Sequence, residues 1–177
     1  NATKAAISTM AIATVVIADL DEARGQEVAE ELGGLFVRVN VADEEDVKNL
    51  FDTTVEHYGR VDVAFNNAGI NPTEDNSILT TDLAAWQKVQ TVNLTSVFLC
   101  CKYALTHMVR QRSGSVINTA SFVALMGAAT SQISYTASKG GVLAMSRELG
   151  VQFARQGIRV NAISAGPIRT LAASGIG

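Results

Sequence analysis

The chain has 177 residues, of which 47% are hydrophobic and 18% are charged, and its formal net charge is −3. These values favour one globular domain over residues 1–177 with a large buried core, and they exclude a disordered chain. Charges of both signs are interspersed without a basic patch, which excludes nucleic acid and anionic membrane surfaces as expected partners.

The first half of the chain alternates strand-like and helix-like segments. Short apolar runs at residues 14–19, 35–41 and 60–69 predict strands. Residues 21–33 carry Glu and Ala at helical spacing, residues 43–59 open with acids, and each segment closes on a glycine, so both predict helices.

The apolar residues 5–18 resemble a signal peptide. No small-residue cleavage site follows them, and the run passes directly into Asp19. We therefore expect a helix that leads into a buried strand. No run reaches the ~18 apolar residues that a membrane-spanning helix requires, so no membrane span is expected.

The second half of the chain continues the alternation. Residues 71–81 form a polar loop, and residues 82–112 follow a helical pattern with Asn93 inside it. Residues 114–121 and 157–164 predict two further strands, with a helix at 134–156 between them. Such alternation predicts an α/β fold: a Rossmann-like, doubly wound parallel sheet in three αβα layers, with right-handed crossovers. Five strands are visible, whereas an ordinary domain of this type has about six or more.

Polar and small residues follow the first three strands, where an open parallel sheet binds its ligands. The carboxylate of Asp19 can accept hydrogen bonds from an adenosine ribose and would repel a 2′-phosphate, which favours NAD over NADP. A helix N-cap explains Asp19 equally well. Asn40 and Val41 could hold the edge and the face of adenine. The small residues of the NNAG stretch, 66–69, let the backbone approach a flat ligand, although an ordinary turn gives the same pattern.

Three residues near the fourth strand suggest proton transfer. Tyr135 and Lys139 are four residues apart, which places both on one face of a helix. A nearby ammonium would lower the pKa of the tyrosine, so that Tyr135 could exchange a proton with a carbonyl or alcohol oxygen held by Ser121. The same spacing is also common on helix surfaces. Asn93 is either a satisfied polar group at a helix interface or a side chain that holds water for a proton relay.

No metal site is expected, because His57 and His107 are isolated. Cys100 and Cys101 are adjacent within an apolar run and are interpreted as small buried residues. A disulfide framework is absent, which fits a cytoplasmic location.

Seven stretches, taken in order, resemble the classical branch of the short-chain dehydrogenase/reductase family over about residues 14–170. They are VVIADLD, VNVAD, DVAFNNAG, VNLTSVF, SVINTAS, YTASKGG and IRVNAISAGP. Within that family the chain is most similar to bacterial 3-oxoacyl-carrier-protein reductases and to related alcohol dehydrogenases.

The resemblance implies a role for each matching residue. Tyr135 would be the catalytic acid/base, Lys139 would hold the nicotinamide ribose and tune Tyr135, Ser121 would orient the substrate oxygen, and Asn93 would complete the relay. Asp19 would take the adenosine ribose. The residues implied to bind the cofactor are Asp19, Leu20, Asn40, Val41, Asn67, Ala68, Gly69, Tyr135, Lys139, Gly166, Ile168 and Thr170.

The chain departs from the family pattern in several places. The spacing from Ser121 to Tyr135 is one residue longer than usual, which a loop insertion absorbs. Ala165 and Gly166 stand where the family has Pro-Gly, and the following residues resemble the tail of enoyl-carrier-protein reductases. That branch spaces its Tyr and Lys more widely than this chain does. The first strand with its glycine loop and the C-terminal substrate region are expected to be missing.

The last eight residues, 170–177, fit the family's TGxxxGIG phosphate loop with Leu171 in place of its first glycine. Three interpretations follow. The chain ends are joined in space, the tail is of the enoyl-reductase type, or the sequence is incomplete at both ends. Leu171 stands where a tight turn needs glycine, and no spare strand precedes Thr170, so both observations argue against joined ends. Of the three interpretations, we favour an incomplete chain.

The sequence therefore predicts an NAD-dependent oxidoreductase that acts on a ketone or secondary alcohol, with a 3-oxoacyl thioester as one candidate substrate. The alternatives are an enoyl-thioester reductase and a cofactor-binding or structural domain without turnover. By the same resemblance we expect a homo-tetramer or homo-dimer built from the helices that contain Asn93 and Tyr135.

Overall fold

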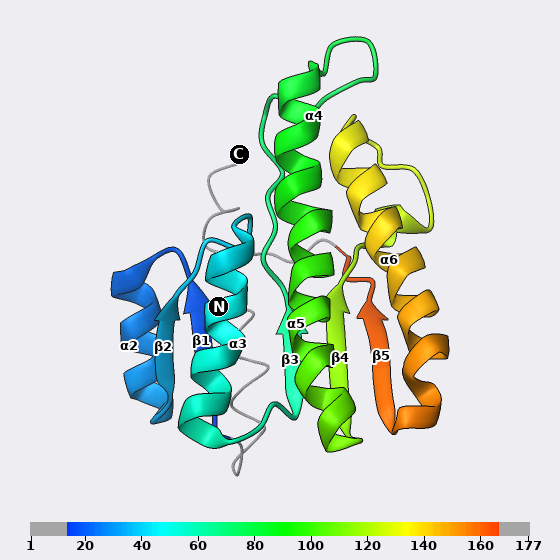
Figure 1. Ribbon diagram of the computed structural model, residues 1–177. Helices are drawn as coiled ribbons and strands as arrows, with labels where there is room; N and C mark the ends of the chain where they lie inside the picture. Colours follow the sequence, from blue (N-terminus) through cyan, green and yellow to red (C-terminus); the bar gives the residue numbers. More distant parts are fainter. Residues whose placement is uncertain (1–13, 167–177) are drawn as a thin grey trace. The chain divides into compact units, whose positions relative to one another are not determined.

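The computed structural model describes residues 14–166, which fall into two compact units, residues 14–40 and residues 41–166 (Figure 1). Every paired strand in both units runs parallel to its neighbour, and helices connect the strands. This confirms the α/β, Rossmann-like fold class. A single domain over residues 1–177 stays a prediction.

The first unit contains two strands joined by one helix. Strand β1 (Val16–Asp19) pairs with β2 (Leu35–Arg38), and α2 (Glu22–Leu32) packs against both. Asp21 is the N-cap of α2, and its side chain accepts a hydrogen bond from the backbone N–H of Arg24 at 3.1 Å. The chain leaves the helix through Gly33 in the left-handed region, the expected glycine stop.

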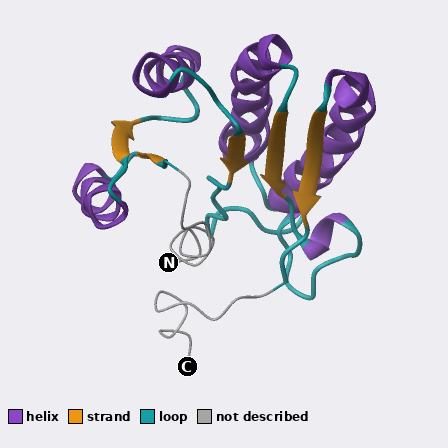
Figure 2. Ribbon diagram, turned by 90° about the horizontal axis from the view of Figure 1, so that it is seen from below, coloured by secondary structure: helices purple, strands orange, loops and turns teal. Residues whose placement is uncertain are grey.

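The second unit contains a three-stranded sheet in the order β3-β4-β5. Its elements, in chain order, are α3 (Glu44–Tyr58), β3 (Val63–Asn66), α4 (Leu83–Gln90), η1 (Thr91–Thr95), α5 (Ser96–Gln111), β4 (Gly114–Thr119), η2 (Phe122–Ala124), α6 (Ile133–Phe153), η3 (Ala154–Gln156) and β5 (Ile158–Ile163). Helices α5 and α6 lie side by side on one face of this sheet (Figure 2).

The core of this unit lies between the sheet and helices α5 and α6. Ala64, Val116 and Val160 are register partners on the three strands, and all three are buried. Successive residues of a strand point to opposite faces, and Phe65, the next residue along β3, is 38% exposed. The sheet therefore buries one row of small side chains beneath the helices that carry the candidate site.

The expected long helix over residues 82–112 is interrupted. A wide π-helical turn, η1, separates α4 from α5, and Asn93 lies inside it. The expected ends are correct: Asp82 caps the start, and Arg112 closes the end in the left-handed region at φ 53°. Within this turn, the Asn93 side chain bonds to Ile70, which lies in a loop outside the helix.

Candidate active site

Tyr135 and Lys139 lie together at the start of α6. The Lys139 ammonium nitrogen is 5.7 Å from the centre of the Tyr135 ring, and Lys139 is only 3% exposed. The helical spacing therefore places these side chains on one face, as predicted. Lys139 is a buried residue, so the alternative of a surface lysine is wrong.

Within residues 14–166, the Lys139 ammonium has one hydrogen-bond acceptor. Its Nζ donates to the backbone carbonyl of Thr119, at the end of β4, at 2.7 Å. Its other N–H groups have no hydrogen-bond partner among the residues that the structure describes. Burial lowers the pKa of Lys139 from its ordinary value. A buried ammonium with unused donors is suited to hydroxyl groups of a ligand.

Gly69 lies beside this ammonium. A Cβ atom at this position would be 3.5 Å from Lys139 Nζ and 3.3 Å from Asn93 Oδ1. The absence of a side chain therefore leaves the backbone of the NNAG turn open next to Lys139 and Asn93. The structure thus brings three of the expected residues together: Gly69, Asn93 and Lys139.

Asn93 is fully buried and forms three hydrogen bonds with its side chain. Its Oδ1 accepts from the N–H of Ile70 at 2.7 Å, and its Nδ2 donates to the Ile70 carbonyl at 2.8 Å and to Ser138 Oγ at 3.2 Å. Both Nδ2 hydrogens are therefore used within the protein. Asn93 is a satisfied polar group at an interface, and its role in holding water stays a prediction.

A close helix contact permits this assembly. A Cβ atom on Gly141 of α6 would lie 2.8 Å from a methyl carbon of Leu94 in η1, so a larger residue would require the Leu94 side chain to move. Because Gly141 is two residues after Lys139, this contact helps to bring the Lys139 turn against the Asn93 turn.

Ser121 is buried just beyond β4. The strand ends at Thr119, two residues earlier than expected, and Ser121 instead caps the short helix η2. Its Oγ accepts a long hydrogen bond of 3.4 Å from the N–H of Val123. The Ser121 hydroxyl donates no hydrogen bond to any residue between 14 and 166, so its hydrogen is available to a ligand oxygen.

The remaining cofactor residues divide between the two units. In residues 41–166, Asn67 accepts a hydrogen bond of 3.1 Å from the Thr119 hydroxyl, Val41 is half-buried, and Ala68 and Gly166 are exposed.

In residues 14–40, Asp19 ends β1 and is exposed, Leu20 is 54% exposed, and Asn40 is half-buried. Asp19 accepts the N–H of Asp21 at 3.0 Å, but Asp21 is the N-cap of α2, so the N-cap alternative for Asp19 is wrong. Ile168 and Thr170 lie outside the described residues.

The sequence reasoning missed Asp75, which it treated as part of a polar loop. Asp75 is 5% exposed, and its carboxylate accepts the backbone N–H groups of Ser134 at 2.8 Å and Tyr135 at 2.7 Å. The one available signal was indirect: Gln132, which precedes α6, is not one of the residue types preferred at a helix N-cap.

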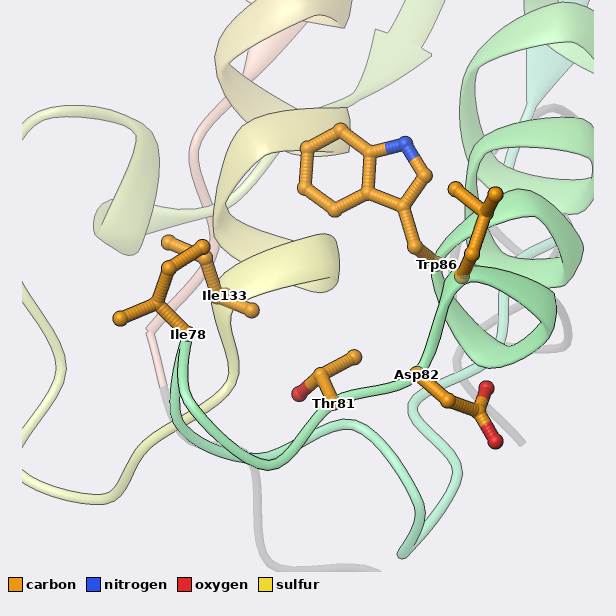
Figure 3. Close-up of a pocket in the computed structure, with 6 residues that line it drawn as sticks. Ile78, Thr81, Asp82, Trp86 and Ile133 are labelled. Atoms are coloured by element: carbon orange, nitrogen blue, oxygen red, sulfur yellow. The ribbon is translucent and has the colours of Figure 1, made fainter.

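An open apolar pocket adjoins the first residue of α6 (Figure 3). Its lining is formed by Ile78, Thr81, Asp82, Leu83, Trp86 and Ile133. In the close-up, the Trp86 ring from α4 faces Ile133 and Ile78, and the Asp82 carboxylate points away from them. One of the lining residues, Ile133, is two residues before Tyr135 in the sequence.

Residues 14–166 contain no group of three or more His, Cys, Asp or Glu that could hold a metal ion. Cys100 and Cys101 are buried free thiols, as expected. Within the same residues, no helix combines the length and apolar character needed to cross a membrane.

Parallel strands joined by helices, with candidate ligand-binding residues beyond the carboxyl ends of the strands, are typical of dinucleotide-binding folds. The family model described as "Enoyl-(Acyl carrier protein) reductase" matches residues 4–177. The chain belongs to the short-chain dehydrogenase/reductase family, which binds a nicotinamide cofactor.

Two curated relatives illustrate the similarity. The chain is 40% identical over 155 residues to secoisolariciresinol dehydrogenase of Forsythia intermedia, covering 86% of this chain and 56% of the relative. It is 40% identical over 163 residues to the 3-oxoacyl-[acyl-carrier-protein] reductase FabG of Chlamydia pneumoniae, covering 89% of this chain and 64% of the relative. The chain thus spans less than two thirds of the length of either relative.

A solved structure, entitled "ElxO with NADP Bound", matches with a TM-score of 0.89 and 28% identity, covering 98% of this chain and 70% of that one. This confirms the predicted family and its fold.

Proposed function

We propose that this chain carries the proton-transfer site of an oxidoreductase that moves a hydride between NAD(H) and a ketone or secondary alcohol. A 3-oxoacyl thioester is the substrate class that we would test first, since the Chlamydia pneumoniae relative is named for it. The observation that carries the proposal is the buried Lys139 ammonium, 5.7 Å from the ring of Tyr135.

The residues around Lys139 fit a nicotinamide cofactor. Lys139 retains N–H donors for the hydroxyl groups of a ribose, and Gly69 leaves the neighbouring backbone accessible. When bound, such a cofactor supplies or accepts the hydride.

The chain's own residues would handle the proton and the orientation of the substrate. Tyr135 would give a proton to the carbonyl oxygen in reduction and take it back in oxidation. Ser121 would donate a hydrogen bond to the same oxygen and so orient the carbon for transfer. The positive charge of Lys139 would stabilise negative charge on the Tyr135 oxygen.

We assign NAD rather than NADP on the basis of Asp19. The exposed carboxylate at the end of β1 can accept hydrogen bonds from the ribose hydroxyls and would repel a 2′-phosphate. One solved relative, ElxO, is named with NADP bound, so the choice between NAD and NADP is tested by direct measurement.

The test is the change in cofactor absorbance with an acetoacetyl thioester, in the wild-type chain and in Tyr135→Phe. We expect Tyr135→Phe to abolish turnover, because it removes only the hydroxyl. Tyr58→Phe, at the end of α3, is the matched control and should keep turnover. If Tyr135→Phe turns over as fast as the control, the assignment of Tyr135 is wrong.

A second candidate is an enoyl-thioester reductase, favoured by the description of the matching family model. The four-residue spacing of Tyr135 and Lys139 favours the ketone reductase instead. Activity on a crotonyl thioester without activity on an acetoacetyl thioester would select the second candidate.

Calorimetry with NADH tests the third possibility, a domain without turnover, and absence of binding would support a structural role.

We further propose a cytoplasmic homo-tetramer or homo-dimer. Phe98 on α5 is a large apolar side chain that is 51% exposed, so a second copy could cover it. Sedimentation of the wild-type chain against Phe98→Glu tests this, with dissociation to monomers as the expected result.

A further inference from the structure

We infer that Asp75 is a positioning residue for Tyr135: it completes the N-terminus of α6 from a distant loop and thereby fixes the turn that carries the tyrosine. The inference rests on the proposed role of Tyr135, and the experiment below separates the two. Three observations support it.

The first is the hydrogen bonding of the helix start. The first N–H groups of an α-helix have no partner within the helix, and a side chain at the N-cap normally accepts one or two of them. Gln132, at this position, forms no such bond. Instead, Asp75 Oδ1 accepts from Ser134 and Asp75 Oδ2 accepts from Tyr135. Each carboxylate oxygen of Asp75 thus accepts a hydrogen bond from one backbone N–H.

The second is the rest of the loop. The Asn76 carbonyl accepts the N–H of Ile133 at 3.1 Å, and Asn71 Nδ2 donates to Gln132 Oε1 at 2.9 Å. The N–H of Thr136 is the first to bond within the helix, to the Gln132 carbonyl at 3.0 Å. The loop after β3 therefore supplies every acceptor that the first turn of α6 lacks.

The third is burial and charge. Asp75 is 5% exposed, and its two bonds are short, at 2.8 and 2.7 Å, as is usual when the acceptor is charged. A negative charge is also favoured at a helix N-terminus. Because Tyr135 itself donates one of these bonds, a movement of Asp75 would displace the backbone that carries the phenol.

The loop is held at its other end as well. Asn93 binds both backbone groups of Ile70, five residues before Asp75. The segment from Ile70 to Asp75 thus connects the Asn93 turn to the Tyr135 turn.

The test compares Asp75→Asn with Asp43→Asn in the full chain. Both aspartates accept two backbone N–H groups at a helix N-terminus, but Asp43 does so for α3, at 2.8 and 3.1 Å. Asp75→Asn keeps the shape of the side chain but faces one of the two amides with its own N–H₂, because Asp75 uses both oxygens. Asp43→Asn can keep both bonds through its amide oxygen, because both amides bond to Asp43 Oδ1. We expect Asp75→Asn to lower the free energy of unfolding more than Asp43→Asn does, so both readouts are taken under conditions in which each variant is fully folded.

The first readout is amide hydrogen exchange at Ser134 and Tyr135. It should become about tenfold faster or more in Asp75→Asn, because a charged acceptor is lost, and stay unchanged in Asp43→Asn. The second readout is kinetic. In Asp75→Asn, kcat should fall by about 10–100-fold with little change in the KM of NADH, since a small misplacement of a reacting group has that effect.

The outcomes are distinguishable. If Tyr135→Phe abolishes turnover while Asp75→Asn matches Asp43→Asn in both readouts, the inference about Asp75 is overturned and the proposed function stands. If Tyr135→Phe remains active, the proposed function fails, and the exchange readout still decides whether Asp75 fixes the turn.

Discussion

The side-chain amide of Asn93 forms two hydrogen bonds with the backbone of Ile70. It accepts from the Ile70 N–H at 2.7 Å and donates to the Ile70 carbonyl at 2.8 Å, which is the pair of bonds that a neighbouring strand can provide. Gln111 does the same for Val61, with both bonds at 2.8 Å. Strand β3 lies between Val61 and Ile70 in the sequence. Side-chain amides thus fix the chain on both sides of the strand that leads into the site.

The first prediction compares these two amides. Asn93→Ala leaves both backbone groups of Ile70 without partners, and the free energy of unfolding should fall by about 2–4 kcal/mol. The NNAG turn would also be released, so the affinity for NADH should fall. Urea unfolding and calorimetry measure the two effects. Gln111→Ala is the control: it should destabilise the chain but leave NADH affinity unchanged, and equal losses of affinity in both variants would contradict the prediction.

The second prediction concerns the cost of burying Lys139. Lys139→Met removes a buried ammonium that has one acceptor in the part of the chain that the structure describes. The free energy of unfolding should therefore rise by about 1–2 kcal/mol, while NADH binding weakens. Chemical unfolding and calorimetry measure the two effects. Lys88→Met, at an exposed site on α4, should change neither. A destabilised Lys139→Met protein would show that the ammonium contributes to the fold.

The third prediction concerns how the difference in stability between the wild type and Lys139→Met depends on pH. Burial lowers the folded pKa of Lys139 from 10.5, so the folded chain binds fewer protons than the unfolded chain between the lowered value and 10.5. Wild-type stability relative to Lys139→Met should therefore rise with pH through this window. Unfolding titrations of both proteins at several pH values measure this, and a constant difference would contradict it.

The fourth prediction concerns cofactor choice. Asp19→Ser removes the carboxylate at the end of β1, so NADH should bind about tenfold more weakly and the preference over NADPH should shrink. Calorimetry with both cofactors measures this. Asp21→Ser is the control, since serine also caps helices well and should leave the preference unchanged. A preference unaffected by Asp19→Ser would remove the basis for assigning NAD.

The fifth prediction concerns the adjacent thiols. Burial raises the pKa of Cys100 to about 12 and that of Cys101 to about 11, from 9.0 in each case. Since the thiolate is the reactive form, iodoacetamide should modify them at least about 100-fold more slowly in the folded chain than in urea at mildly alkaline pH. Intact mass after timed quenching measures this, and equal rates would show that the thiols are accessible.

Much of the fold was predictable because its signals are local. Asp21, Asp43 and Asp82 each precede a helix and cap it, and Gly33 and Gly59 close two of these helices. The face shared by Tyr135 and Lys139 follows from helical periodicity alone. These features depend on neighbouring residues, so the sequence is sufficient to find them.

The parts that were missed depend on distant partners. The π turn at 91–95 contains Asn93, whose partner Ile70 is 23 residues earlier. The role of Asp75 requires α6, which begins 58 residues later at Ile133. No local pattern in a polar loop distinguishes such a residue from a solvated one. Ser121 shows a smaller error of the same kind, because the strand before it ends at Thr119.

The dependence of α6 on Asp75 also has a consequence for the order of folding. The contacts that complete the first turn of α6 span about 60 residues, so they carry the entropic cost of closing a long loop. The body of α6 can form from local contacts, whereas its first turn must wait for β3 and the loop after it. Substitutions at Asp75 should therefore accelerate unfolding more than they slow folding. The turn that carries Tyr135 would then be among the last parts of the chain to become ordered.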